Sequence, residues 1–112
     1  MTTTNYTGPV QSDNGFIIGN GSTIAGVLKA TATLDFASIN AAASADLTIT
    51  VTGAAVGDIV GLALPAAPAA GLVFNAFVSA ANTVTVRASN ITAAPVDAAS
   101  ASYSVVVTQV TA

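Results

Sequence analysis

The chain has 112 residues, a length that corresponds to a single domain. Only 6% of the residues are charged, against about 25% in an ordinary globular protein, and 53% are hydrophobic. The basic residues Lys29 and Arg87 are too few to neutralise the phosphates of a nucleic acid or to bind an anionic membrane surface. The absence of Cys and His removes disulfides, thiolate chemistry and the commonest general base and metal ligand. Composition therefore favours a structural role over an enzyme.

Residues 1–22 differ from the rest of the chain. They are rich in Thr, Asn and Gly, and turn signals recur through them. The apolar run Phe16-Ile17-Ile18 lies between two of these turns, and a solvated tail has no use for three bulky apolar residues in succession. The pattern predicts an extended N-terminal arm over 1–22 with one local anchor, followed by a β-domain over 23–112. A disordered terminus is the alternative.

The segments that follow alternate between apolar and polar residues, which is typical of half-buried strands. Segment 47–52 is the clearest, with Leu, Ile and Val on one face and threonines on the other. Segments 83–88 and 32–36 repeat this pattern. The inward residues predicted from the three segments are Leu47, Ile49, Val51, Val84, Val86, Ala88, Leu34 and Phe36. Turn residues separate the strands every 10 to 15 residues or so, which predicts an all-β fold, an antiparallel, jelly-roll-like β-sandwich.

Two Ala-rich segments, 41–45 and 66–70, have helical propensity but are short, and Pro65 and Pro68 disfavour a helix in the second. We expect loops or a single helical turn there. The longest stretch without a charged or strongly polar residue, 59–74, is shorter than the roughly 20 apolar residues of a transmembrane helix. With no leader-like N-terminus, the sequence indicates a non-exported protein that does not enter membranes.

Three predicted strands, within 58–64, 72–78 and 104–110, are apolar on both faces. A two-layer sandwich buries only one face of each sheet, so the second face needs another cover: the arm, a loop or another subunit. Tolerated exposure of Val and Ala is the alternative. We favour subunit contacts. The candidate interface residues are Val73, Phe77, Arg87, Val106 and Val110.

No catalytic, metal-binding or cofactor-binding constellation can be assembled, and none is predicted. The acidic residues are all Asp and are scattered along the chain, and most of them lie at apparent turns or strand ends where Asp bonds the local backbone. Serine nucleophiles have no His partner. Arg87 lies on a clean strand and faces solvent, a subunit boundary or a cross-strand Asp.

Three segments, 32–39, 44–58 and 78–87, together with 90–97 and 103–107, resemble a small β-domain common in tailed-bacteriophage virion proteins. Members of that family occur as capsid decoration (cement) proteins and as modules of head or tail fibres. The resemblance covers about residues 22–110 and implies an antiparallel β-sandwich, often trimeric, attached to a phage particle.

A freestanding module with a short arm suits a decoration protein that binds the outside of the capsid and stabilises its lattice. The resemblance thus implies a homotrimer on the capsid exterior, made in the bacterial cytoplasm, with the major capsid protein as partner. The predicted capsid contact is the arm, through Tyr6, Pro9, Phe16, Ile17 and Ile18. Alternatives are a fibre or receptor- and glycan-binding module, and an adhesin-type surface domain.

Overall fold

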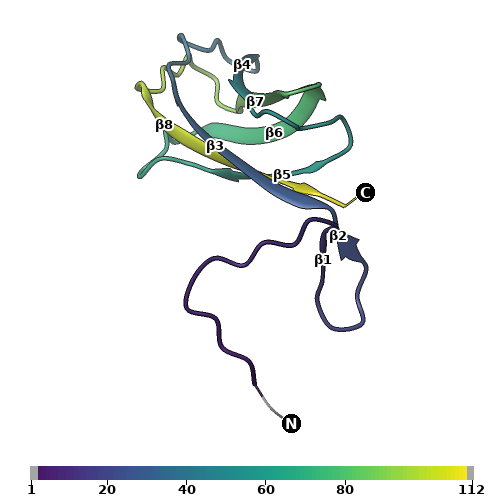
Figure 1. Ribbon diagram of the computed structural model, residues 1–112. Coiled ribbons are helices and arrows are strands. Elements are labelled where there is room, and N and C mark those ends of the chain that lie inside the picture. The colour runs from purple at the N-terminus through teal and green to yellow at the C-terminus, as the bar shows by residue number, and fades with distance from the viewer. Residues whose placement is uncertain (1–2, 111–112) are drawn as a thin grey trace.

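The computed structural model describes residues 3–110, which form eight strands and no helix (Figure 1). A hairpin, β1 (Phe16–Ile17) and β2 (Thr23–Ile24), precedes two three-stranded sheets. The first sheet has the order β3-β8-β5, with bounds Gly26–Leu34, Ala101–Gln109 and Ile59–Ala63. The second has the order β4-β7-β6, with bounds Ser44–Thr50, Thr83–Asn90 and Leu72–Ala80. All pairings are antiparallel, which confirms the predicted all-β sandwich.

The chain changes sheet at each connection between β3 and β8 except one, the β6–β7 hairpin. This wrapping is jelly-roll-like, with three strands a sheet where a full jelly roll has two four-stranded sheets. The hairpin turns through Ala81-Asn82, where Asn82 has a left-handed φ of 62° that Asn tolerates well. The side-chain Oδ1 of Asn82 accepts from the Gly53 amide at 2.8 Å. The turn of one hairpin thereby fixes the loop that follows β4.

The core lies between the sheets, and its most buried residues belong to the two central strands, β7 and β8. Each predicted inward face is confirmed: Leu47 packs against the core, and the other seven residues named above are at most 6% exposed. Phe36, Phe74 and Tyr103 form an aromatic cluster with ring centroids 5.8 to 6.0 Å apart. Burial raises the pKa of the Tyr103 phenol.

Asn90 ends β7 and is 2% exposed, yet its amide is fully bonded. Its Nδ2 donates to the carbonyl oxygens of Ile39 and Ala94, at 2.9 and 2.8 Å. Its Oδ1 accepts from the backbone N and the hydroxyl of Thr92, at 2.8 and 2.7 Å. This single side chain ties β7 to the loops on either side of it, because a buried polar group must find partners inside the fold.

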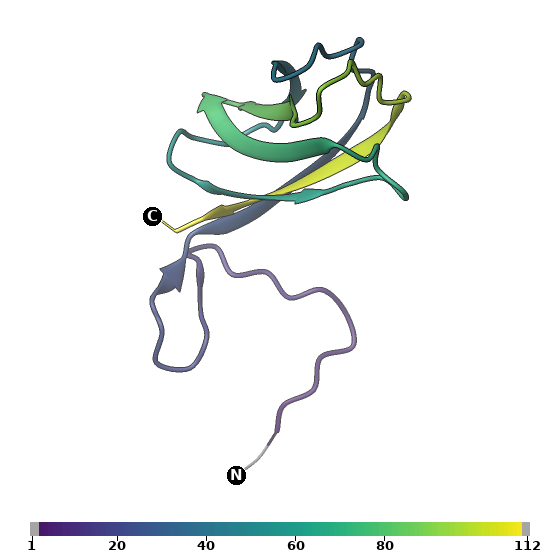
Figure 2. The same cartoon turned by 180° about the vertical axis from the view of Figure 1, so that it is seen from behind.

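The arm leads away from the sandwich, and the views from front and back agree on this (Figures 1 and 2). The radius of gyration is 17.5 Å, against about 13 Å for a compact chain of this length. The predicted boundary at residue 22 falls inside the β1–β2 hairpin, in the turn before β2. The two Ala-rich segments contain turns and irregular backbone, and Ser44-Ala45 starts β4.

Candidate assembly surface

The outer face of the β3-β8-β5 sheet carries exposed aliphatic side chains. Val27, Ile59 and Val106 are 63%, 57% and 43% exposed. The strand register places Val27 and Ile59 on either side of Thr108, and it places Lys29 and Gly61 on either side of Val106. We call this surface, made of Val27, Lys29, Ile59, Gly61, Val106 and Thr108, the apolar face.

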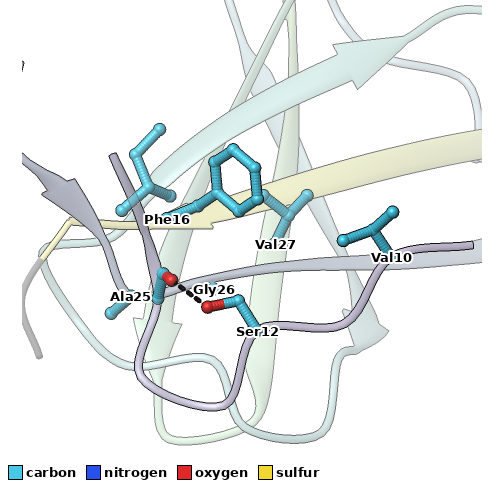
Figure 3. Close-up of a pocket in the computed structure, with 8 residues that line it drawn as sticks. Val10, Ser12, Phe16, Ala25, Gly26 and Val27 are labelled. Carbon is cyan, nitrogen blue, oxygen red and sulfur yellow. Dashed lines mark hydrogen bonds between the residues drawn. The ribbon is translucent and has the colours of Figure 1, made fainter. Parts of the chain in front are cut away.

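A hollow of about 310 Å³ lies where the arm meets the edge of the apolar face. Val10 and Phe16 of the arm and Val27 of β3 line it together (Figure 3). The arm turns here because the Ser12 hydroxyl donates to the Gly15 carbonyl and Gly15 has a φ of 93°, which favours glycine. Apolar surface therefore continues from the arm onto the sheet.

The outer face of the β4-β7-β6 sheet is different, because its polar side chains bond to one another. The hydroxyls of Ser44 and Ser89 lie 2.8 Å apart across two strands. In the next row, Arg87 donates to both carboxylate oxygens of Asp46, from Nε at 2.8 Å and from a terminal nitrogen at 3.0 Å. The register also places Val73, which is 51% exposed, in the row of Ser44 and Ser89. We call this surface, made of Ser44, Asp46, Val73, Asn75, Phe77, Thr85, Arg87 and Ser89, the polar face.

The bond from Arg87 holds the pKa of Asp46 below its usual value, and the carboxylate in turn raises the pKa of Arg87. The guanidinium also lies 5.2 Å from the centroid of the Phe77 ring. Both partners of the pair are nearly half exposed, so solvent screens the attraction. Of the options for Arg87, the structure shows the cross-strand Asp.

The predicted capsid-contact residues all lie on the surface. Tyr6 and Pro9 are exposed along the extended arm, and Phe16, Ile17 and Ile18 are 54% to 72% exposed in the β1–β2 hairpin. Phe16 pairs with Ile24 across this hairpin, and Ile17 pairs with Thr23. The hairpin therefore presents three bulky apolar side chains that its own sandwich does not cover.

The five predicted interface residues do not form one surface. Val73, Phe77 and Arg87 lie on the outer side of β6 and β7, whereas Val106 lies on the apolar face and Val110 follows the end of β8. The strands predicted to be apolar on both faces thus expose their outward residues on opposite sides of the sandwich.

The predicted interface residues did not include Val10, Val27 and Ile59, each of which is more than half exposed. A signal for Val27 was present: residues 26–34 alternate, with Leu28 and Ala30 on one face and Val27 and Lys29 on the other. The sequence shows no comparable signal for Val10, which becomes part of a surface only through the fold of the arm.

Residues 3–110 contain no group of three or more His, Cys, Asp or Glu side chains placed to hold a metal ion. In the same range, no helix has the length and hydropathy needed to cross a membrane. Protein-family models, curated proteins and solved structures gave no match to this chain.

Proposed function

We propose that this protein is a structural component of a tailed-phage virion, a capsid decoration protein that binds the outside of the head as a trimer and stabilises the capsid lattice. The observation that carries the proposal is the hairpin, where strand pairing holds Phe16 and Ile17, a turn bond from the Gly21 amide holds the Ile18 carbonyl, and all three side chains remain exposed. Contiguous exposed apolar side chains mark interaction sites in soluble proteins. The sequence resemblance over residues 22–110 is the basis for proposing a tailed-phage particle.

In this proposal the protein acts mechanically. The hairpin inserts its apolar side chains into the shell, and the sandwich stands outside it. A trimer matches the three-fold positions of an icosahedral lattice, because the symmetry of a bound oligomer must suit its site. The binding energy is mostly apolar, so we expect affinity for the head to change by less than about threefold between low and high salt.

A glycan-binding fibre module has weaker support. Sugar recognition commonly uses an open aromatic platform, whereas Phe77 on the polar face is half-buried and has the guanidinium of Arg87 over its ring. The exposed aromatic rings Tyr6 and Phe16 belong to the arm.

Co-sedimentation with empty heads, assembled from the capsid protein of the same genome, tests the proposed function. The double variant Ile17→Thr/Ile18→Thr should lower the affinity at least about tenfold, since each loss of a buried aliphatic side chain weakens an apolar contact. The matched control is Ile91→Thr, because Ile91 is 72% exposed, as Ile18 is, but lies after β7. Absence of wild-type binding, or equal binding by the double variant and the control, would contradict the proposal.

A further inference from the structure

We propose that the arm of a second copy of this chain lies across the apolar face, with its Asp13 beside Lys29. This inference goes beyond the proposed function, because it concerns how copies hold one another and applies to the free protein in solution.

The first observation behind this proposal is the presence of glycine at position 61. Gly61 lies within β5 and has no left-handed φ. A Cβ built on Gly61 would meet only the Val106 carbonyl oxygen, at 3.9 Å, which is ordinary contact. Nothing within the fold therefore requires glycine at this position, although glycine weakens a strand. β5 has no bulge in its pairing with β8, and a glycine in a regular strand often lies where a ligand or another backbone approaches closely.

The apolar side chains around Gly61 fit an extended segment. Val27 and Ile59 lie on the outer strands of the sheet, about 10 Å apart by strand spacing. In the arm, Tyr6 and Val10 are separated by about 13 Å when extended, and both are more than half exposed. An arm segment can thus place its two large apolar side chains across all three strands. Its backbone then passes over Thr108 and beside Gly61, which lies in the next row, opposite Val106.

The charges are complementary. Lys29 is exposed and is the only charged residue of strands β3, β5 and β8. The ion pair found among residues 3–110 joins Arg87 to Asp46, so Lys29 has no acidic partner there. Asp13 is the only charged side chain of the arm, and its sole side-chain hydrogen bond comes from Gln11.

The occupant is a second copy because the arm leads away from the sandwich to which it belongs. Val10 lines the hollow beside Val27 of the same chain, and the residues before it continue outward (Figures 1 and 3). The arm and the apolar face are different parts of the chain, so each copy can give one arm and receive another. Head-to-tail contacts of this kind form a closed ring when the rotation between copies closes.

Mass measurement over a range of protein concentrations tests the contact without any capsid. The wild-type protein should self-associate, and Gly61→Thr should weaken association at least about tenfold, because the new side chain stands where the arm backbone would pass. Its melting temperature should stay the same or rise, since threonine suits a strand. Ala63→Thr is the matched control on the same face of β5 and should change association less than about twofold. A wild-type protein that stays monomeric to about 100 μM overturns the proposal, as does a Gly61→Thr variant that associates normally.

Charge reversal tests the register of the contact. Lys29→Asp and Asp13→Lys should each weaken association about three- to tenfold, because like charges then face one another. Combining both changes in one chain should restore the wild-type value to within about twofold. Failure of the double variant to recover association would overturn the pairing of Asp13 with Lys29.

The natural absence of cysteine allows a direct test of which copy supplies the arm. A chain with Asp13→Cys mixed with a chain with Lys29→Cys should form a disulfide-linked heterodimer under mild oxidation. The single chain with both substitutions should form linked oligomers. An intrachain disulfide at monomer mass would show that the arm covers its own sheet and would overturn the exchange. Each result is independent of head binding. A failed cross-link removes only the arm contact, whereas a monomeric wild-type protein also removes the proposed trimer but leaves binding to the head to be tested by co-sedimentation.

Discussion

The outer faces of the two sheets differ in their exposed side chains. On the polar face, cross-strand side chains bond within the chain, as Arg87 does with Asp46 and Ser44 with Ser89. On the apolar face, Val27, Ile59 and Val106 remain exposed. The inner faces of both sheets are apolar, because they line the core. The outer faces need not be apolar for the chain to fold, so the difference between them supports the contact proposed on the apolar face.

The largest expected effect comes from breaking the most complete set of internal bonds. Asn90→Ala removes four hydrogen bonds and leaves the carbonyls of Ile39 and Ala94 without this partner. We expect a loss of about 3 kcal/mol in the free energy of unfolding, measured by chemical denaturation. Asn75→Ala, on the exposed polar face, is the control and should stay within about 0.5 kcal/mol of wild type. A loss below about 1 kcal/mol for Asn90→Ala would show that this network is not structural.

Substitutions at two neighbouring residues of β8 allow a direct comparison of the inner and outer sides of its sheet. Val105→Thr places a hydroxyl in the core, where Val105 is 1% exposed, and should cost about 1–3 kcal/mol in unfolding free energy. Val106→Thr, on the apolar face, should change stability by less than about 0.5 kcal/mol but weaken self-association. Denaturation and mass measurement on both variants separate the two effects. If Val106→Thr destabilised the fold as much as Val105→Thr, the apolar face would belong to the core.

The smallest effect concerns the ion pair on the polar face. The bond from Arg87 lowers the pKa of Asp46 from its ordinary 3.8, so the folded state favours the charged carboxylate. The stability that this pair contributes is present above pH of about 4 and is lost as pH falls through the lowered pKa. The melting-temperature difference between wild type and Asp46→Asn should therefore be constant from pH 7 to pH 5 and shrink below about pH 4. Self-association should not change, and a change would place this face in the contact.

Much of the fold could be predicted because a strand shows residues i and i+2 on the same face. That rule found the inward residues of β4 and β7 without knowledge of their partners. It could not show which strands share a sheet, since pairing joins residues far apart, as Lys29 and Val106 are. For this reason Val73 and Val106 were grouped in one predicted interface, although they lie on opposite faces of the sandwich.

The candidate site was harder to predict for a related reason. The apolar run Phe16-Ile17-Ile18 can be recognised from the sequence alone, and the structure places it in an exposed hairpin. Asn90, by contrast, is of a residue type common in turns but is the buried end of β7. Its carbonyl partners come from separate loops, and only the folded chain brings them within reach.

The central position of β8 determines when this protein can fold. Strands β3 and β5 both pair with β8, which lies between them and follows them in the chain. During synthesis the first two strands of that sheet have no partner until residue 109 has left the ribosome. Contacts between such distant residues form slowly. Folding of this sheet therefore awaits the synthesis of β8, and any truncation within β8 leaves two strands without the neighbour that joins them.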